Sequence, residues 1–393
     1  METLIELYDN RPLENVLATE VFRPARTVFV CSEDLEDSKA QRRKIRRYLD
    51  HRGIGTEILF RQTRLYNAGE VFALLRSVTD SYPDCAIDIT GGTDDALFAA
   101  GRLSADRPEL PVFTYSRRKN RFFSIRNADF ASDLECPVSY TVEDIILMAG
   151  GSLQMGRVDN SILAGYMDRI EPFYELYSRN RRDWVRAVEY IQQISAVRPD
   201  EPVPLSVRGD YYQKGERGGR LAAPEQILRE YERIGFLSGL RIEADKSVEF
   251  RFADLQIRAW MRDVGSVLEL YTYKVCVESG SFNDVVTSAV VDWEGERGRT
   301  GVTNEIDVVA TRGVIPVFIS CKTCDVKTEA INELSILRDR FGGEMARAYL
   351  VTTGACSYMA KRRAAELKIG ILDRQDIASG AFRKSMETLG KRL

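Results

Sequence analysis

Short apolar runs alternate with amphipathic segments over the first third of the chain. The apolar runs are rich in β-branched and aromatic residues and are too short for helices. The segments between them have helical spacing, as in residues 39–49, which follow Ser38 as a helix cap and end before Gly53. Repeated strand-then-helix units predict a doubly wound, Rossmann-like parallel α/β sheet. The predicted strands are residues 27–31, 56–60, 85–89, 111–115 and 122–125, and the predicted helices are residues 39–49, 71–81 and 94–102.

The middle of the chain has helical periodicity first and turn-forming residues later. We predict helices over residues 140–148, 160–177, 184–194 and 224–234. Residues 199–224 are polar and rich in Gly and Pro, which predicts an exposed loop. The helix over 224–234 is followed by a predicted hairpin of residues 240–244 and 247–252. This order is typical of a helical connector with a winged-helix-like module.

A second α/β pattern follows the connector. A helix is predicted over residues 264–279, and strands over 284–291, 305–310 and 315–321. A chain of 393 residues, at about 150 residues per domain, has room for two or three domains. We therefore predict an N-terminal domain over 1–139, the connector over 140–262 and a C-terminal domain over 263–393.

The amino-acid composition limits both the cellular location expected for the protein and the kinds of catalytic site that it could contain. No stretch approaches the ~18 apolar residues of a membrane span, and the acidic N-terminus does not resemble a signal peptide, so we expect a cytoplasmic protein without a membrane partner. A single histidine, His51, excludes Ser-His-Asp and Cys-His hydrolases and HExxH metalloproteases. The seven cysteines are expected to be reduced thiols. With a net charge of −3, any site for a polyanion must be a local patch.

Two loops fall at the carboxyl ends of predicted strands in the N-terminal domain. They are Ser32 with Glu33, and the run of Thr90, Gly91, Gly92 and Thr93. Glycines let a backbone approach a ligand closely, and the following helix start attracts anions, so a phosphate-bearing ligand is one interpretation. A tight strand-to-helix turn without a ligand is an equally good interpretation of the same residues.

The last domain carries the candidate catalytic residues. Strand alternation places Glu305 and Asp307 on one face and Ile306 and Val308 on the other. A hairpin through Arg312 and Gly313 would bring Asp307 close to Lys322. This layout is typical of restriction-endonuclease-like sites, in which carboxylates hold a divalent metal and a lysine positions water or stabilises charge on phosphorus.

The metal ligands predicted here are Glu269, Glu305 and Asp307, with Glu269 on the preceding helix. The usual pattern has a carboxylate two residues before the lysine, whereas Ser320 stands there in this chain. We predict Lys322, Asp307, Glu269 and Ser320 as catalytic residues. A plain salt bridge between Asp307 and Lys322 remains an alternative. The pair Cys321 and Cys324 lacks a second cysteine pair or a nearby histidine, so we do not predict zinc there.

Several motifs together resemble a known family, the CRISPR-associated ancillary nucleases that join a CARF sensor domain to a restriction-endonuclease-like domain. The motifs are residues 4–9, 15–19, 88–93, 304–307 and 318–323. The serine in place of the acid is itself familiar in this group. The resemblance spans nearly the whole chain and assigns residues 1–139 to the CARF domain and 263–393 to the nuclease domain.

The resemblance implies a specific function. Members of this family are homodimers whose paired CARF domains bind cyclic oligoadenylate, most often cyclic tetra-adenylate, made in type III CRISPR defence. Binding switches on cutting of nucleic acid with manganese or magnesium. The expected substrates are single-stranded DNA or RNA, or a nicked duplex, and the expected ligand site includes Ser32, Glu33 and residues 90–93. The alternative is a ligand-controlled nucleic-acid-binding regulator with an inactive endonuclease fold, for which the helix over 224–234 offers Gln226, Arg229 and Arg233.

Overall fold

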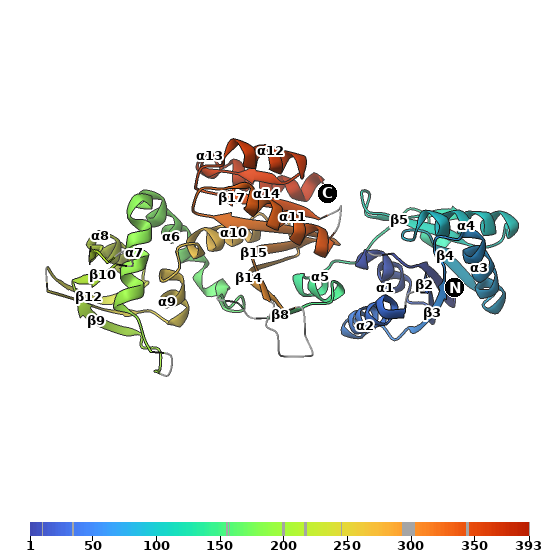
Figure 1. Cartoon of the computed structure of the whole chain (residues 1–393), viewed down its shortest axis with the longest axis horizontal. Coiled ribbons are helices and arrows are strands. Elements are labelled where there is room, and N and C mark those ends of the chain that lie inside the picture. Colours follow the sequence, from blue (N-terminus) through green and yellow to red (C-terminus); the bar gives the residue numbers. More distant parts are fainter. Residues whose placement is uncertain are drawn as a thin grey trace.

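The protein is described from a computed structural model of the whole chain. The described residues are 1–9, 11–33, 35–154, 156, 158–198, 201–215, 218–244, 246–292, 303–342 and 346–392. Figure 1 shows three parts in a row, with the N-terminal domain (blue to cyan) at one end and the C-terminal domain (orange to red) in the middle. The module of residues 158–262 (green to yellow) lies at the other end. The predicted α/β fold class is confirmed.

The N-terminal sheet has the strand order β3-β2-β1-β4-β5-β6-β7, in which β1 to β5 are parallel. Its strands are β1 (Thr3–Leu7), β2 (Arg26–Ser32), β3 (Glu57–Thr63), β4 (Cys85–Asp88), β5 (Val112–Ser116), β6 (Arg121–Arg126) and β7 (Leu134–Glu135). The sequence pattern does not predict β1, because a glutamate, Glu6, interrupts its apolar run. In the structure β1 lies between β2 and β4 with all five of its residues buried.

Helices cover both faces of this sheet, as a doubly wound fold requires. They are η1 (Pro12–Asn15), α1 (Leu17–Phe22), α2 (Leu35–His51), α3 (Ala68–Ser81), α4 (Asp94–Asp106) and the short η2 (Asp129–Ala131). Tyr48 of α2 packs in the same core as Leu4 and Phe29. Val71 of α3 packs in a second core with Ile5. Because helices cover both faces of the sheet, a ligand is expected at the edge formed by the carboxyl ends of the strands, where such folds bind ligands.

The middle module combines helices with a small antiparallel sheet of order β12-β13-β9. Its elements are η3 (Leu163–Tyr166), α6 (Met167–Arg179), α7 (Arg181–Ile194), β9 (Ser206–Asp210), β10 (Tyr212–Lys214), β11 (Arg220–Ala222), α8 (Glu225–Arg233), β12 (Leu237–Glu243), β13 (Ser247–Phe252) and α9 (Leu255–Met261). The helix α8 precedes the β12–β13 hairpin, in the predicted order. The prediction of an exposed loop over 199–224 is wrong for the residues that form β9, β10 and β11. The polar composition of residues 199–224 is typical of a loop. The strand β9 nevertheless forms because it pairs with β13, which lies much later in the chain.

The C-terminal sheet has the order β18-β17-β16-β15-β14-β8. Its strands are β8 (Ser152–Gln154), β14 (Asp284–Asp292), β15 (Thr303–Arg312), β16 (Ile315–Lys322), β17 (Arg347–Thr352) and β18 (Gly370–Leu372). Around it lie α5 (Val142–Met148), α10 (Ser266–Glu278), α11 (Thr328–Gly342), α12 (Tyr358–Glu366), α13 (Arg374–Ala378) and α14 (Ala381–Arg392). The edge strand β8 comes from the range predicted as connector. Among the described helices of the whole chain, none is both long and apolar enough to cross a membrane.

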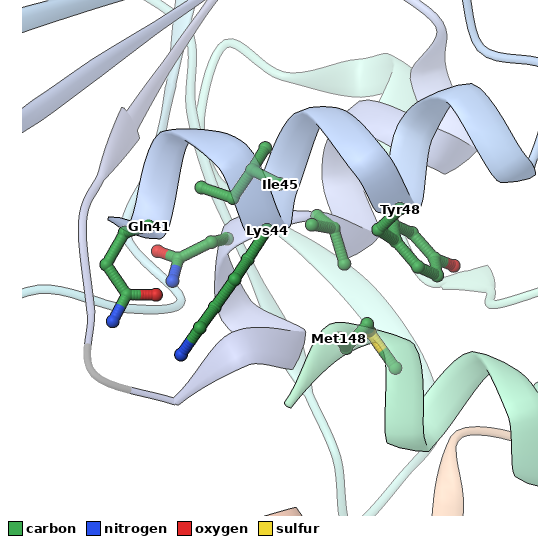
Figure 2. A pocket seen from close by; sticks show the side chains of 7 residues that line it. Gln41, Lys44, Ile45, Tyr48 and Met148 are labelled. Carbon is green, nitrogen blue, oxygen red and sulfur yellow. The ribbon is translucent and has the colours of Figure 1, made fainter. Parts of the chain in front are cut away.

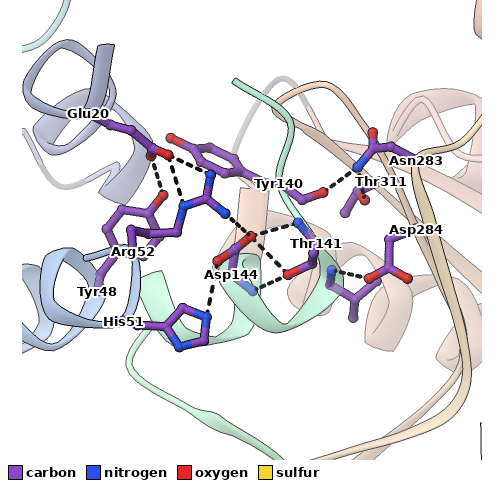
Figure 3. Close-up of polar contacts among 11 residues, drawn as sticks. Glu20, Tyr48, His51, Arg52, Tyr140, Thr141, Asp144, Asn283, Asp284 and Thr311 are labelled. Atoms are coloured by element: carbon purple, nitrogen blue, oxygen red, sulfur yellow. Dashed lines mark hydrogen bonds and ion pairs between the residues drawn. The ribbon is translucent and has the colours of Figure 1, made fainter. Parts of the chain in front are cut away.

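The N-terminal domain meets the C-terminal domain through α2 and α5. Arg52, just after α2, donates to Glu20 of α1 at 2.9 Å and to Asp144 of α5 at 3.3 Å (Figure 3). Asp144 is fully buried and also accepts the N–H of Thr141, the residue that caps α5, at 2.8 Å. His51 lies 3.5 Å from the same carboxylate. The single histidine is therefore part of the junction.

The start of α5 is bonded in turn to the C-terminal sheet. Asp284, at the start of β14, accepts the N–H of Val142 at 2.8 Å (Figure 3). Asn283 donates to the carbonyl of Tyr140 at 2.6 Å and accepts the N–H of Gly313, in the β15–β16 turn, at 2.8 Å. A continuous set of hydrogen bonds therefore connects the end of α2 with two strands of the C-terminal sheet.

A small pocket lies beside this junction. Lys44, Ile45 and Tyr48 of α2 line it together with Met148 of α5 (Figure 2). Its volume is about 10 Å³. This space is near the size of one water molecule, so α2 and α5 are packed closely.

Candidate functional site

The structure brings three predicted catalytic residues together where β15 and β16 separate. The pairing of the two strands ends at Val308 and Ile319. Beyond that pair, Oδ2 of Asp307 accepts the main-chain N–H of Cys321 at 2.6 Å and the hydroxyl of Ser320 at 3.1 Å. The amine of Lys322 lies 3.7 Å from the same oxygen. The carboxylate is thus held in the gap between the strands, next to a cation.

The neighbouring strand β14 is distorted beside Asp307. Ser288, which lies opposite Asp307, has φ +52°, a left-handed conformation that is costly for a non-glycine residue. The side chain of Asn160, from the middle module, accepts the N–H of Thr287 and donates to its carbonyl, both at 2.9 Å. The hydroxyl of Thr287 donates to the carbonyl of Asp307 at 2.9 Å. Asn160 therefore fixes the strand that supports Asp307.

Glu269, the predicted ligand on the preceding helix, lies buried on α10 with 5% of its surface exposed. Burial raises the pKa of the Cys321 thiol well above its usual value, and the Asp307 carboxylate raises that pKa further. Glu269 adds to the same increase, while Lys322 opposes it. All three charged groups are therefore near Cys321, at the end of β16.

Glu305 is placed differently from Asp307. Its Oε1 accepts the hydroxyl of Ser288 at 2.5 Å, and the residue is exposed. Ile306 and Val308, predicted to share a face, lie in different hydrophobic cores. The strand alternation is interrupted here because β15 pairs with the distorted part of β14.

The donor set fits a hard divalent cation held by few protein ligands. No cluster of three or more metal-binding side chains occurs among the described residues. Carboxylate oxygens of Asp307 and Glu269 are the ligands that Mg²⁺ and Mn²⁺ prefer. Mg²⁺ is commonly bound by one or two carboxylates, with water and substrate phosphate completing its shell. The arrangement therefore suits a metal that binds together with a phosphodiester.

In the N-terminal domain, the predicted ligand loop makes contacts of its own. The hydroxyl of Thr90 donates to Asp88 at 2.5 Å and accepts the N–H of Tyr115 at 2.7 Å. Thr93 caps α4 by accepting the N–H of Ala96. Both threonine hydroxyls therefore stabilise the turn.

The two glycines of this loop are needed for close packing. A Cβ at Gly92, which has φ +101°, would lie 2.7 Å from Cβ of Leu7. A Cβ at Gly91 would lie 3.0 Å from Cβ of Asp9. The loop is thus pressed against the end of β1, as the tight-turn interpretation requires, and the same packing leaves the glycine backbone at the carboxyl edge of the sheet.

A charged cluster that the sequence analysis missed lies at this edge. The N–H of Gly92 donates to Asp9 at 3.1 Å, and Arg11 donates to the same carboxylate at 2.8 Å. Burial opposes ionisation of Asp9, but the hydrogen bonds and charge of Arg11 outweigh it and lower the pKa. Arg117, from the β5–β6 turn, and Arg11 both pair with Glu14. An apolar run ending in Tyr8 and Asp9 was the available signal for this cluster.

The remaining predicted ligand residues, Ser32 and Glu33, end β2 at the same edge. The main-chain N–H of Glu33 donates to the carbonyl of Thr63 at 3.1 Å, and the Glu33 side chain is exposed. The carbonyl of Ser32 accepts from the Gln62 side chain at 3.4 Å. The structure therefore gathers Ser32, Glu33 and the 90–93 loop along one edge.

A buried pair of carboxyl groups lies beneath this edge. Glu6 of β1 and Asp88 of β4 are direct neighbours in the parallel register and are 1% and 2% exposed. Burial raises the pKa of both groups, and the charge of Asp88 raises the pKa of Glu6 further. Oε1 of Glu6 has no hydrogen-bond partner among the described residues. We therefore expect Glu6 to be protonated at neutral pH.

Comparison with known proteins defines the class of the C-terminal domain. Residues 259–388 match a family model described as Card1-like, endonuclease domain. No curated protein matches the chain. The part of the chain that holds Asp307, Ser320 and Lys322 is therefore similar to a Card1-like endonuclease domain.

Solved structures match the chain over its full length. Protein VC1899 from Vibrio cholerae matches with a TM-score of 0.75 and 16% identity, over 99% of this chain and 98% of that chain. Can2 from Sulfobacillus thermosulfidooxidans, solved in complex with cyclic tetra-adenylate, matches with a TM-score of 0.70 and 16% identity, over 100% of this chain and 98% of that chain. The resemblance stated from the sequence motifs is confirmed for the endonuclease domain and for the fold.

Proposed function

We propose that the protein is a metal-dependent nuclease activated by cyclic tetra-adenylate, and that it cleaves single-stranded DNA or RNA and nicks duplex DNA in type III CRISPR defence. The observation that carries this proposal is the position of Asp307 beside Lys322, in the gap between β15 and β16 of a Card1-like endonuclease domain. Two donors at 2.6 and 3.1 Å fix that carboxylate, so it is prepared to bind a cation.

Each residue has a distinct role in this mechanism. Asp307 and Glu269 would hold Mg²⁺ or Mn²⁺, which when bound polarises the phosphodiester and lowers the pKa of a bound water. The ammonium of Lys322 stabilises the negative charge that develops on the phosphoryl oxygens. Ser320 orients Asp307 through its hydrogen bond. The serine thus takes over part of the positioning, while Glu269 supplies the second carboxylate.

The activator site is assigned to the carboxyl edge of the N-terminal sheet. The backbone of Gly91 and Gly92 lies there with Arg11 and Arg117, the cations that a phosphate ligand needs. The Asp9 carboxylate accepts the N–H of Gly92 and pairs with Arg11, so a phosphate would bind these groups by replacing Asp9. The similarity to Can2, which was solved with cyclic tetra-adenylate, supports this choice of ligand.

A homodimer is part of the proposal because two large apolar side chains are exposed beside this edge. Tyr66 is 76% and Phe98 is 68% exposed. Tyr66 lies in the loop between β3 and α3, and Phe98 lies on α4. The hydroxyl of Thr93, the cap of α4, donates to the carbonyl of Leu65 in that loop at 3.2 Å. A cyclic ligand on a two-fold axis would contact the same loops of both subunits.

The activator signal has a physical route to the nuclease domain. The helix α2 begins at the carboxyl edge, just after β2, and ends at the Arg52–Asp144 contact. From Asp144 the hydrogen bonds continue through α5 to β14 and to the β15–β16 turn (Figure 3). An activator that favours one position of α2 would therefore change the nuclease sheet.

One cleavage experiment tests the proposed function. Labelled single-stranded RNA, single-stranded DNA and supercoiled plasmid are each incubated with Mn²⁺, with and without cyclic tetra-adenylate, using wild type and Lys322→Ala. We expect cleavage only with both metal and activator, and none with the variant. The substrate that is cut identifies the preferred nucleic acid.

The competing function is a ligand-controlled regulator that binds nucleic acid without cutting it. Tight binding of cyclic tetra-adenylate with no cleavage of any substrate would favour it. The structure gives this alternative little support, because Arg229 and Arg233 of α8 pair with Glu225 and Glu230 of the same helix at 3.6 and 2.7 Å. These contacts neutralise the charges that would bind a DNA backbone.

A further inference from the structure

A polar pocket of about 520 Å³ lies next to the candidate nuclease site. It is formed at the carboxyl ends of the parallel strands β16, β17 and β18, where open α/β sheets bind ligands. Its volume lies in the range of small-ligand sites, about 300–1,000 Å³. The charged residues that line it are Arg181, Asp325, Lys361, Asp373 and Arg374.

The pocket walls are fixed by hydrogen bonds between two loops. The N–H of Val326 donates to the carbonyl of Ala355 at 2.8 Å, and the N–H of Ala355 donates to Asp325 at 2.9 Å. A Cβ at Gly354 would lie 2.0 Å from the carbonyl oxygen of Cys324, so no side chain fits there. Main-chain contacts of the fold therefore fix the shape of the pocket.

The middle module completes this wall. Arg181, at the start of α7, donates to the carbonyl of Thr353. Tyr177, near the end of α6, is hydrogen-bonded to the hydroxyl of the same threonine. The pocket is thus formed by two parts of the protein and includes an arginine from the connector.

Its charge favours an anion. The carboxylate of Asp325 accepts a main-chain N–H, and that of Asp373 accepts the N–H groups at the start of α13. Among the described residues, Arg181, Lys361 and Arg374 form no ion pair. Three cations from three elements therefore face one space, and the two acids there are already hydrogen-bonded to the backbone.

The pocket is directly connected to the catalytic strand. The carbonyl of Lys322 accepts the N–H of Thr353 at 3.1 Å and the hydroxyl of Thr352 at 2.9 Å. Thr353 itself lines the pocket. A nucleic-acid strand that is bound with its scissile phosphate at Lys322 would therefore have the neighbouring phosphates beside this pocket.

An exposed aromatic side chain lies on the helix that carries Lys361. Tyr358, the first residue of α12, is 72% exposed and lies one helical turn before Lys361, on the same side of the helix. Single-stranded nucleic acids are bound by cations that contact phosphates and by aromatic rings on which bases stack. Basic and aromatic groups occur together here.

We propose that this pocket binds a backbone phosphate of the single-stranded substrate through Arg181, Lys361 and Arg374, with the adjacent base stacked on Tyr358. The proposal rests on the proposed nuclease function and deepens it by assigning the surface that guides the strand to Lys322. Arg181, which comes from the middle module, gives that module a role in substrate binding.

The test measures binding separately from cutting. Labelled single-stranded DNA and RNA are titrated with the full-length protein in EDTA, with and without cyclic tetra-adenylate, so that no substrate is cleaved. We expect the double variant Lys361→Gln/Arg374→Gln to bind about tenfold more weakly, and the slope of log K against log salt to fall by about 0.7, since the contact with one phosphate is lost. Tyr358→Ala should weaken binding without changing the salt slope.

Matched controls keep the result interpretable. Arg362→Gln removes an exposed charge from the same helix outside the pocket and should leave the affinity within about twofold of wild type. Lys322→Ala should not cut. If the pocket variants bind and cut like wild type, the pocket proposal is overturned while the nuclease function stands. If wild type neither binds nor cuts any strand, both proposals are overturned.

Discussion

Asp307 is held by two donors of different kinds, and this difference leads to a prediction. The main-chain N–H of Cys321 is the closer donor, at 2.6 Å, and the Ser320 hydroxyl is the second, at 3.1 Å. Ser320→Ala removes the longer of the two hydrogen bonds to the carboxylate and leaves the main-chain donor in place, so we expect activated cleavage to fall by about tenfold. Lys322→Ala removes charge stabilisation and should cost about 100-fold or more. Single-turnover cleavage rates give both values, and an equally severe loss in Ser320→Ala would show that the serine acts directly on the substrate.

The buried pair of Glu6 and Asp88 makes the stability depend on pH. Burial raises the pKa of Asp88 to about 7, and burial together with the charge of Asp88 raises the pKa of Glu6, so the folded state binds more protons than the unfolded state, in which these pKa values are near 4. The free energy of unfolding should therefore decrease as pH rises from about 4 to about 7. Glu6→Gln mimics the protonated group and removes part of this dependence.

We expect Glu6→Gln to raise Tm at pH 8 by about 2–4 °C, which corresponds to about 1 kcal/mol, and to change it less at pH 5. Thermal unfolding of the full-length protein at both pH values provides the measurement. An equal change in Tm at pH 5 and pH 8 would contradict the assignment of a shared proton to this pair.

The sequence predicts the residues of a site only where short-range geometry, such as strand alternation, is sufficient to bring their side chains together. Asp307, Ser320 and Lys322 were predicted because two strands joined by a short turn bring these positions together by alternation alone. Asn160 was missed because its role depends on β14, far away in the sequence. Asp9 was missed because its partner, Gly92, lies in the loop after β4, a strand that pairs with β1 only in the folded sheet. Contacts of this kind leave no periodic signal.

The same limit applies to whole elements. The strands β2 to β6 have apolar runs that identify them, and all were predicted. The strand β9 has one buried residue, Val207, and is held by its partner β13. The strands β17 and β18 lie after residue 321, in a part of the chain over which no strand was predicted. Elements stabilised mainly by tertiary pairing are thus the ones that sequence patterns do not show.

The junction between α2 and α5 leads to a prediction about activation. Asp144→Asn removes the charge that Arg52 and the cap of α5 share. We expect the variant to bind cyclic tetra-adenylate as wild type does, whereas the stimulation of cleavage by the activator falls at least about fivefold, the lower end of typical allosteric coupling. Calorimetric binding and cleavage assays at saturating activator measure the two quantities separately.

Glu143→Gln is the matched control, because Glu143 is the exposed neighbour on the same helix. It should change neither quantity. If the activator stimulates cleavage by Asp144→Asn as strongly as cleavage by wild type, the signal does not pass through this contact. A loss of activator binding in the same variant would instead indicate a damaged fold.

At the scale of the whole molecule, we propose that the activator site is one half of a symmetric site. The carboxyl edge presents Arg11 and Arg117, and the exposed side chains of Tyr66 and Phe98 are those that a second copy would cover. The nuclease domain lies between this edge and the middle module (Figure 1). Pairing at the edge would therefore bring two nuclease domains under the control of one ligand.

Phe98→Glu tests this arrangement. A charge in the centre of the proposed interface should convert the dimer to a monomer in sedimentation velocity, and since half of the ligand contacts come from the other subunit, affinity for cyclic tetra-adenylate should fall about 100-fold or more. Leu255→Glu, at an exposed apolar position of the middle module, should leave both quantities unchanged. A Phe98→Glu protein that still dimerises and binds the activator tightly would place the dimer interface elsewhere. A wild-type protein that is monomeric even with saturating activator would exclude the two-fold site altogether.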